Sequence, residues 1–190
     1  MFLARVTCPM KISNGLWFDG MIGIWSIVDI KVAQRTSKNQ PKGAKVLVPA
    51  MVYGERYMKL MIKEVIPAIK ACMPRMEGHT IFVQQDGAKP HTKVGIMGAT
   101  EEAAGADIVI EAQPANSPDL SVNDLKFFHS IQQLKEEVGV TNTQELVEAT
   151  TEAFDVYPRE TLKRVWQSLF AVCGEVLGSK GENVYKIPPT

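Results

Sequence analysis

The chain has 190 residues, of which 45% are hydrophobic, so it can bury a real core as one domain with an appendage. Lysine plus arginine and aspartate plus glutamate both number 21, and the net charge of zero excludes an overall electrostatic attraction to nucleic acid; such a surface must be a local patch. No apolar run approaches the roughly 18 residues that a membrane span needs, and the start lacks the basic-then-apolar layout of a signal peptide.

The chain opens with a predicted β-hairpin. Residues 1–8 are apolar enough for a strand, and Pro9 ends it. The dipeptides Asn14-Gly15 and Asp19-Gly20 favour turns, so we expect the chain to return as an antiparallel strand over residues 21–28.

A polar stretch over residues 34–45 follows, which predicts an exposed loop. It carries four basic residues: Arg35, Lys38, Lys42 and Lys45. A flexible basic loop of this kind can contact the phosphates of a duplex, but a simple solvated loop fits the same pattern. Residues 46–52 are of strand type, and the apolar spacing of residues 55–72 predicts an amphipathic helix that Pro67 kinks or divides.

The next strand ends at an acid, in the stretch IFVQQDGAKPH. Asp86 therefore lies at the carboxyl end of a buried strand, where open α/β sheets bind ligands, although an aspartate there can also cap the following turn. Residues 93–104 predict a helix that ends at Gly105, and residues 107–112 predict a second strand. The order strand, helix, strand implies a parallel crossover beside the Asp86 strand.

A second acid, Asp124, follows a segment that Pro114 and Pro118 keep irregular. Apolar residues recur after it at helical spacing, namely Leu125, Phe128, Ile131 and Leu134. They place Asp124 in the first turn of a helix, where the macrodipole alone favours an acid. Asp119 and Ser121 are rival caps of that helix.

Two further helices complete the predicted order. Thr141 and Gln144 fit a capping box that opens a helix from about Thr143 to Val156. Pro158 suits the first turn of the last helix, which closes at Gly178. Its apolar face is predicted to comprise Leu162, Val165, Trp166, Leu169, Phe170 and Cys173. The three cysteines lack the paired spacing of a zinc site, which predicts reduced, mostly buried thiols and an intracellular compartment.

The two acidic segments together resemble mariner-type transposases, members of the DDE transposase and integrase superfamily. The segment QQDGAKPH is similar to the family motif QQDNAPPH or QQDNARPH, and PANSPDLSVND is similar to PPNSPDLNxxD, with the acids 124 − 86 = 38 positions apart. The segments FDGMIGIW, EVIPAIKA and NVYKIP look like plant and oomycete relatives, so the resemblance covers essentially the whole chain. Gly87 stands where the family usually has asparagine.

The resemblance implies an α/β fold: an RNase H-like mixed sheet flanked by helices, with a C-terminal helical pair. It implies that Asp86 and Asp124 are catalytic and bind Mg²⁺ or Mn²⁺, that the partner is DNA at transposon ends and targets, and that a homodimer can form. It also implies that the protein works in the nucleus, with the cytoplasm as the alternative for a non-functional fragment. The family's first acid lies on the opening strand in a motif like DEKWF, which this sequence lacks, and residues 1–8 look like the second strand. We therefore expect an N-terminally truncated domain that lacks the first strand, with residues 1–140 forming a partial catalytic domain and residues 141–190 its helical extension.

Three functions follow from these expectations. The first is a transposase fragment related to metal-dependent DNA cleavage and strand transfer, inactive alone and marginally stable. The second is an intact metal-dependent endonuclease in which Asp29 replaces the first acid, and the third is a domesticated module that binds nucleic acid or a partner without chemistry. If the family geometry holds, we expect the carboxylates of Asp86 and Asp124 about 4–7 Å apart, because oxygens ligate a hard cation at about 2.0–2.6 Å, and we expect His91 to be structural.

Overall fold

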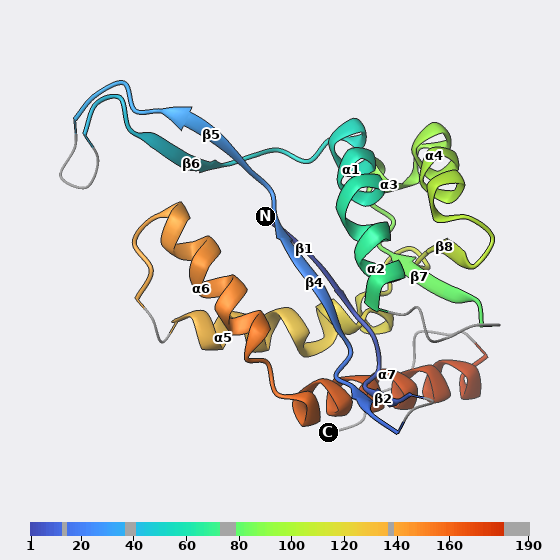
Figure 1. Cartoon of the computed structure of the whole chain (residues 1–190). Helices are drawn as coiled ribbons and strands as arrows, with labels where there is room; N and C mark the ends of the chain where they lie inside the picture. The colour runs from blue at the N-terminus through green and yellow to red at the C-terminus, as the bar shows by residue number, and fades with distance from the viewer. Residues whose placement is uncertain (13–14, 37–40, 73–78, 137–138, 181–190) are drawn as a thin grey trace.

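The computed structural model of the chain describes residues 1–12, 15–36, 41–72, 79–136 and 139–180 (Figure 1). Within these ranges the strands pair two by two in four ladders. β1 (Phe2–Val6) runs antiparallel to β4 (Met21–Ser26), whereas β7 (Ile81–Gln85) runs parallel to β8 (Ile108–Ala112). Both pairings were predicted from the sequence and are confirmed.

Two further hairpins extend from the first. β2 (Met10–Lys11) pairs with β3 (Trp17–Phe18), and β5 (Val28–Val32) pairs with β6 (Lys45–Pro49). The strand predicted over residues 21–28 therefore ends earlier, and a new strand begins at Val28. The sequence of β5, VDIKV, alternates charged and apolar residues, which is typical of a strand with one buried face. In the structure Ile30 and Val32 on the apolar face are nevertheless exposed. The predicted loop lies between β5 and β6, on a hairpin that projects from the body of the molecule (Figure 1).

The predicted helix over residues 55–72 is present, with one change of winding. It consists of α1 (Gly54–Leu60), the π-helical turn η1 (Met61–Val65) and α2 (Ile66–Cys72). Proline lacks an N–H group and disrupts the regular helical ladder, and here the wider turn ends at Val65, two residues before Pro67. The winding therefore changes near Val65, where the sequence predicted a kink or a division of the helix.

The β7–β8 ladder is covered on one face by this helix and by α4 (Val94–Ala104), which follows the short α3 (Lys89–Thr92). The helix α4 ends at Gly105, as predicted, in a conformation with a φ of 78° that favours glycine. The buried cluster that results is called the local core. It comprises Tyr57, Met61, Val65, Ile66, Ile69, Val83, Ala104, Ile108 and Ile110.

A second cluster lies on the other side of the β1–β4 ladder (Figure 1). It is built by η2 (Pro118–Leu120), η3 (Asn123–Phe127), α5 (Phe128–Glu136), α6 (Thr143–Asp155) and α7 (Arg159–Gly178). This cluster is called the distal core. Its buried residues are Ala4, Val122, Phe127, Ile131, Ala153, Phe154, Tyr157, Leu162, Val165 and Leu169. The predicted boundary at residue 140 stays a prediction.

Several details of the distal core differ from the sequence prediction. Phe127 is fully buried, whereas Leu125 and Phe128 are half-buried, because η3 is a π-helical turn with one residue more per turn and shifts the apolar positions. The α6 helix is capped by Asn142, not Thr141.

The last helix and the cysteines also depart from expectation. Pro158 is the residue before α7 and not part of its first turn, and Phe170 is exposed because it lies on the outer side of that helix. All three cysteines are unpaired, but Cys72 is exposed and the other two are half-buried, so the predicted burial was wrong. Among the described helices, none has both the length and the apolar character needed to cross a bilayer.

Candidate active site

Asp86 directly follows β7, at the carboxyl end of the strand, as the sequence predicted. Its Oδ1 accepts a hydrogen bond from the backbone N–H of Ala88 at 3.0 Å, and the same oxygen lies 2.5 Å from Nδ1 of His91. The side chain remains 57% exposed. Asp86 therefore shapes the turn after the strand and still presents its carboxylate to solvent.

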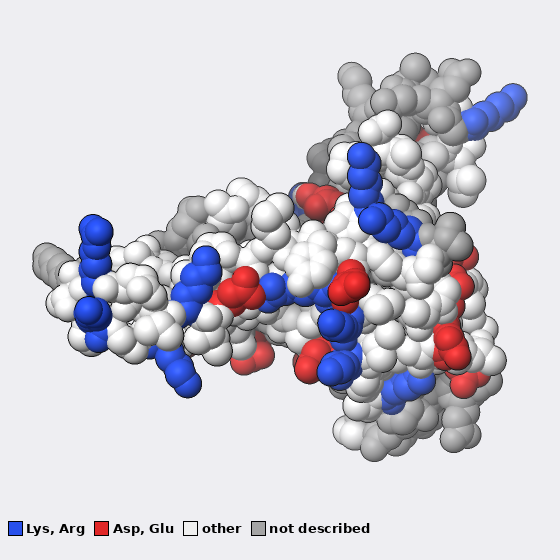
Figure 2. All heavy atoms as spheres, turned by 90° about the horizontal axis from the view of Figure 1, so that it is seen from above, with Lys and Arg blue, Asp and Glu red and all other residues white. Residues whose placement is uncertain are grey.

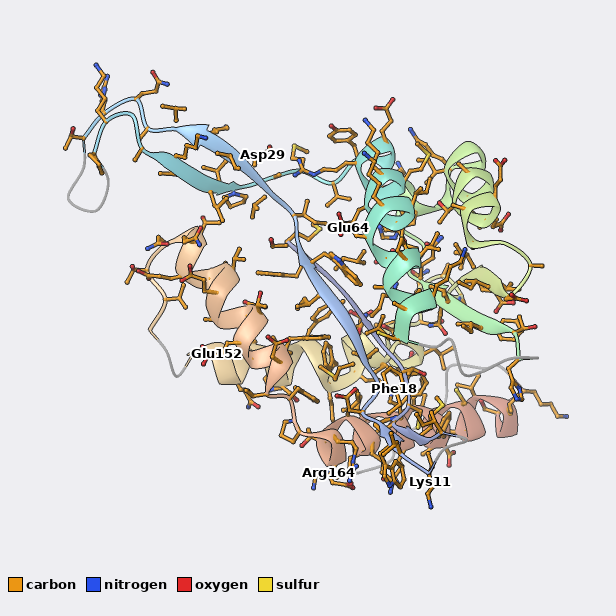
Figure 3. All side chains as sticks on the ribbon, viewed as in Figure 1. Lys11, Phe18, Asp29, Glu64, Glu152 and Arg164 are labelled. Atoms are coloured by element: carbon orange, nitrogen blue, oxygen red, sulfur yellow. The ribbon has the colours of Figure 1, made fainter. Side chains whose placement is uncertain are left out.

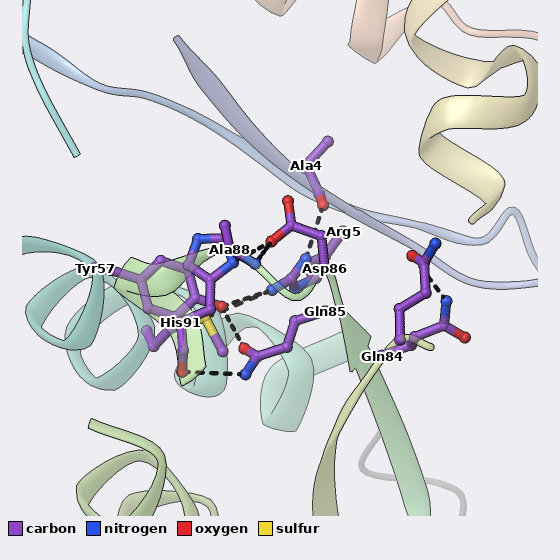
Figure 4. A network of polar contacts seen from close by, with 10 residues as sticks. Ala4, Arg5, Tyr57, Gln84, Gln85, Asp86, Ala88 and His91 are labelled. Atoms are coloured by element: carbon purple, nitrogen blue, oxygen red, sulfur yellow. Dashed lines mark hydrogen bonds and ion pairs between the residues drawn. The ribbon is translucent and has the colours of Figure 1, made fainter. Parts of the chain in front are cut away.

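His91 is held from two sides (Figure 4). Its ring stacks on that of Tyr57, with centroids 3.9 Å apart, and its backbone carbonyl accepts a hydrogen bond from Nε2 of Gln85 at 3.4 Å. The side chain was expected to be structural, and it contacts the carboxylate of Asp86. His91 thus fixes the orientation of the acid that precedes it by five residues.

A buried polar relay connects β1 to β7 through the helix α1. Nη2 of Arg5 donates to the Tyr57 hydroxyl at 3.2 Å, and that hydroxyl donates to Oε1 of Gln85 at 2.6 Å (Figure 4). Burial raises the pKa of Tyr57, and the charge of Asp86 raises it further, whereas Arg5 lowers it. The hydroxyl is therefore kept protonated and can serve as the donor to Gln85.

Sequence reasoning missed the roles of Arg5 and Tyr57. The apolar spacing that predicted the helix over residues 55–72 includes Tyr57, which fits its buried ring but not its hydroxyl. The available signal was Arg5 itself, a single charge inside the otherwise apolar strand FLARV. Buried charges are rare unless they have a partner, so such a residue predicts a polar contact within the core.

Asp124 lies in the first turn of η3, as predicted, and is exposed. Its backbone N–H donates to Oγ of Ser121 at 3.3 Å, so Ser121 is the residue that caps this helix. The segment before it is tied to the Asp86 strand, because Nε2 of Gln84 donates to the carbonyl of Leu120 at 2.7 Å. The two acid-bearing segments are thereby joined by a direct hydrogen bond.

Asp86 and Asp124 line one cavity of about 550 Å³. Carboxylate oxygens are the ligands that Mg²⁺ and Mn²⁺ prefer, so these two residues fit such an ion in type. Across the described ranges, however, no three His, Cys, Asp or Glu residues lie close enough together to hold a metal. The described residues thus offer part of a ligand set.

Asp29, the candidate substitute for a third acid, lies elsewhere. It belongs to β5, opposite Val48, and its Oδ1 lies 2.7 Å from Nη1 of Arg56. Figure 3 shows it on the projecting hairpin, and it is not among the residues that line the cavity of Asp86 and Asp124. Asp29 therefore does not line this cavity with Asp86 and Asp124, because β4 ends at Ser26 and Asp29 belongs to the next hairpin. The endonuclease interpretation itself stays a prediction.

No protein-family model matches the chain, and no curated protein sequence does either. Among solved structures, the catalytic domain of Mos1 mariner transposase superposes with a TM-score of 0.61 at 20% identity, covering 75% of this chain and 70% of that one. The Mos1 catalytic domain with Raltegravir and Mg gives a TM-score of 0.63 at 18% identity, with 97% and 85% covered. A Mos1 paired-end complex with the left transposon end gives 0.58 at 18% identity, with 96% and 54% covered.

These likenesses establish the fold. The chain has the RNase H-like α/β fold of a transposase catalytic domain, as the sequence predicted. Other structures of Mos1 were solved with Mn, as the catalytic domain with Raltegravir and as a paired-end complex.

Proposed function

We propose that this chain is a mariner-type transposase catalytic domain of the plant and oomycete kind, related to metal-dependent DNA cleavage and strand transfer. The observation that carries the proposal is that Asp86 and Asp124, the acids of the two recognised motifs, line one cavity. The hydrogen bond from Gln84 to Leu120 supports it, because it holds the two motifs side by side. Separate turn-forming roles for the two acids would not require them to line the same cavity.

The site residues have distinct roles in this proposal. Asp86 and Asp124 would hold Mg²⁺ or Mn²⁺, which supplies Lewis-acid stabilisation of phosphodiester oxygens when bound. His91 orients Asp86, and the relay through Tyr57 fixes Gln85 beside it. Two carboxylates retain one ion weakly, so the chain alone neither cuts nor joins DNA.

DNA is the proposed partner, with the projecting β5–β6 hairpin as one contact surface. Its described part carries Lys31, Arg35, Lys42 and Lys45, all exposed, and Figure 2 shows Lys and Arg side chains distributed along it. Positive side chains on a projecting hairpin can follow phosphates without reading sequence. Lys38, also expected there, lies outside the described residues. The DNA partner is supported by the structural neighbour Mos1, which is seen in a paired-end complex with the left transposon end. A homodimer and a nuclear location belong to the same proposal.

A non-catalytic module is the second candidate. The observation in its favour is that Oδ1 of Asp86 is already used by the N–H of Ala88 and by His91. In that case the acid serves the turn, and the fold acts by binding alone.

Manganese binding tests the site directly. Titration of the purified chain with Mn²⁺, followed by the electron paramagnetic resonance of the free ion, should detect one weak site. Asp86→Asn and Asp124→Asn should each abolish it, because each removes a charged ligand while preserving shape. Asp29→Asn is the matched control and should leave binding unchanged. Equal binding by all four proteins would remove the metal site from the proposal and favour the non-catalytic module.

Activity is tested on a supercoiled plasmid with Mn²⁺. The wild-type chain should nick it no faster than Asp86→Ala. Nicking well above background that disappears in Asp86→Ala would overturn the proposed inactivity and require a further acid at the site.

A further inference from the structure

The short β2–β3 hairpin presents two different faces. Met10 lies opposite Phe18, and Lys11 lies opposite Trp17. Residues directly opposite each other in an antiparallel pair share a face, so Met10 and Phe18 form one face and Lys11 and Trp17 form the other. The first face is half-buried, whereas Lys11 is exposed and Trp17 is 51% exposed. The hairpin therefore packs through Met10 and Phe18 and leaves much of Trp17 in solvent.

Contacts at the base of this hairpin hold it against α7. Gly20 follows β3 and is buried, and a Cβ atom at this position would lie 3.1 Å from Cδ2 of Leu162 in α7. The backbone N–H of Thr7 donates to the carbonyl of Gly20 at 2.8 Å. Because these contacts anchor the hairpin, its position does not depend on the exposed side of the Trp17 ring.

Positive side chains gather around Trp17. The guanidinium carbon of Arg159, at the start of α7, lies over the ring, 4.9 Å from its centroid, and Lys11 is the cross-strand neighbour of Trp17. Lys163 follows Arg159 by about one helical turn and therefore lies on the same side of α7. Burial raises the pKa of Cys8 and the charge of Lys163 lowers it, so Lys163 lies near the segment that leads into the hairpin. These residues, Lys11, Trp17, Arg159 and Lys163, are called the Trp17 patch.

The Trp17 patch is positive overall. Glu160 contacts it, because its Oε1 lies 3.3 Å from Nη2 of Arg159, but both side chains of this pair are exposed. An exposed ion pair contributes little free energy and does not prevent Arg159 from contacting a ligand. Within the described ranges, neither Lys11 nor Lys163 belongs to an ion pair. The patch thus combines positive charge with an exposed aromatic ring, which fits a negatively charged ligand that has a flat apolar surface.

The Trp17 patch lies apart from the surfaces already assigned. None of its members is among the described residues that line the cavity of Asp86 and Asp124. Figure 3 shows Lys11 at one end of the molecule and Asp29, on the β5–β6 hairpin, at the other. A ligand bound here would be additional to a metal at the two acids and to a duplex on the β5–β6 hairpin.

We propose that the Trp17 patch binds a single-stranded segment of nucleic acid, with an unpaired base stacked on the exposed part of the Trp17 ring and phosphates beside the positive side chains. Aromatic side chains that stack bases, set in a positive surface that follows the backbone, are the common means of single-strand binding. Bases in a duplex already stack on one another, so a duplex would use the charges and not the ring. An acidic polypeptide would likewise use the charges alone. The proposal does not rest on metal binding or on cleavage.

Fluorescence anisotropy separates stacking from charge. The full chain is titrated, in the presence of EDTA, into a fluorescein-labelled strand of twelve thymidines or an abasic strand with the same phosphates. The wild type should bind the thymidine strand about tenfold or more tightly than the abasic strand. Trp17→Leu should lose this preference by weakening only the thymidine strand, and its unchanged binding of the abasic strand would show that the variant is folded. Trp17→Phe keeps a ring and should retain most of the preference.

Phe170→Leu is the matched control for the ring. Phe170 is also an exposed aromatic residue, on the outer side of α7 and outside the patch, so this variant should bind both strands as the wild type does.

Salt dependence tests the positive side chains. The logarithm of the affinity for a single strand falls with the logarithm of the salt concentration, with a slope of about −0.7 for each phosphate neutralised. Lys11→Gln and Lys163→Gln should each make the slope shallower by about 0.7. Lys59→Gln, at an exposed position of α1, is the matched control and should leave the slope unchanged.

Four outcomes would overturn the proposal. The first is no binding of the thymidine strand, and the second is equal weakening of both strands by Trp17→Leu, which would mean that the ring does not stack a base. In the third, a duplex of the same length or a labelled peptide of glutamates depends on Trp17 as strongly as the thymidine strand does, which would assign the patch to another ligand. In the fourth, Lys31→Gln weakens the thymidine strand and Lys11→Gln does not, which would place the strand on the β5–β6 hairpin. Because EDTA removes divalent metal, failure of the proposed metal site would change none of these results.

Discussion

The local core and the distal core differ in how far apart their residues lie along the chain. The local core is assembled from residues between Tyr57 and Ile110, in the order helix, strand, helix, strand. The distal core joins Ala4 near one end of the chain to Leu169 near the other. The first is therefore determined by neighbouring segments, and the second requires distant segments to meet.

Each core positions one of the two acids. Asp86 follows a strand of the local core, and Asp124 begins a helix of the distal core. The relay from Arg5 through Tyr57 to Gln85 crosses between them, as does the bond from Gln84 to Leu120. These hydrogen bonds connect the segments that carry the two acids.

The largest expected effect comes from the centre of the distal core. Phe127 is fully buried, and its ring lies 5.0 Å from that of Tyr157 and 6.2 Å from that of Phe154, between centroids. Phe127→Ala should lower the free energy of unfolding by about 3–5 kcal/mol, because it leaves a large cavity. Urea denaturation followed by circular dichroism measures the change.

Two further variants compare the stability cost of a substitution in the distal core with the cost in the local core and at an exposed position. Met61→Ala, at an equally buried position of the local core, should cost about 2–5 kcal/mol. Phe170→Ala, at an exposed position of α7, should change stability by no more than about 0.5 kcal/mol. An effect of Phe170→Ala as large as that of Phe127→Ala would mean that α7 packs through its other face.

The substitution Tyr57→Phe tests the relay of hydrogen bonds from Arg5 through Tyr57 to Gln85. The change keeps the stacked ring but removes the hydroxyl, which leaves Oε1 of Gln85 without this donor. Nη2 of Arg5 loses its oxygen acceptor and keeps only the weak contact with Sδ of Met61 at 3.8 Å. Unfolding free energy should fall by about 1–3 kcal/mol, the cost of unsatisfied buried polar groups. Tyr53→Phe, at an exposed position, is the matched control and should be neutral. If both variants unfold at the same urea concentration, the relay contributes nothing to stability.

The same hydroxyl predicts a dependence on alkaline pH. The pKa of Tyr57 is raised, chiefly by burial, so the folded state favours the protonated form over the unfolded state, whose pKa is about 10. Its contribution to stability is complete below that value and is lost as the pH rises through the folded pKa. The advantage of the wild type over Tyr57→Phe should therefore shrink above about pH 10. Burial also raises the pKa of Tyr157, so Tyr57→Phe itself should keep some alkaline loss. A constant difference between the two proteins across this range would contradict the raised pKa of Tyr57.

The sequence was most informative where structure is local. The helices that end at Cys72 and Gly105 and the parallel strands around Asp86 follow from periodicity and turn residues over short windows. The burial of Ile131 was predicted in the same way, but that of Phe127 was not, because periodicity assumes 3.6 residues per turn and η3 is wider. The positions of the acids at strand end and helix start were predictable, whereas the relay through Tyr57 depends on tertiary contacts that no window contains.

The smallest expected effect distinguishes two capping arrangements at the start of α6. The pattern in the sequence favoured Thr141 with Gln144, but Oδ1 of Asn142 accepts from the N–H of Glu145 at 3.0 Å. The carboxylate of Glu145 in turn accepts from the N–H of Thr141 at 2.8 Å, and these hydrogen bonds hold the pKa of Glu145 below its usual value. Asn142→Ala should therefore cost about 1 kcal/mol, because the first turn of the helix loses an acceptor for its free N–H groups.

Gln144→Ala is the matched control for this cap. The Gln144 side chain is exposed and donates to Glu148 at 2.6 Å, an i to i+4 contact that contributes about 0.2–0.5 kcal/mol. Thermal unfolding of the two variants separates the arrangements, since the order of their melting temperatures reverses if Gln144 is the capping residue. A helix start that depends on Asn142 also means that α6 begins from its own local sequence, even though its buried face, with Ala153 and Phe154, belongs to the core that joins distant segments.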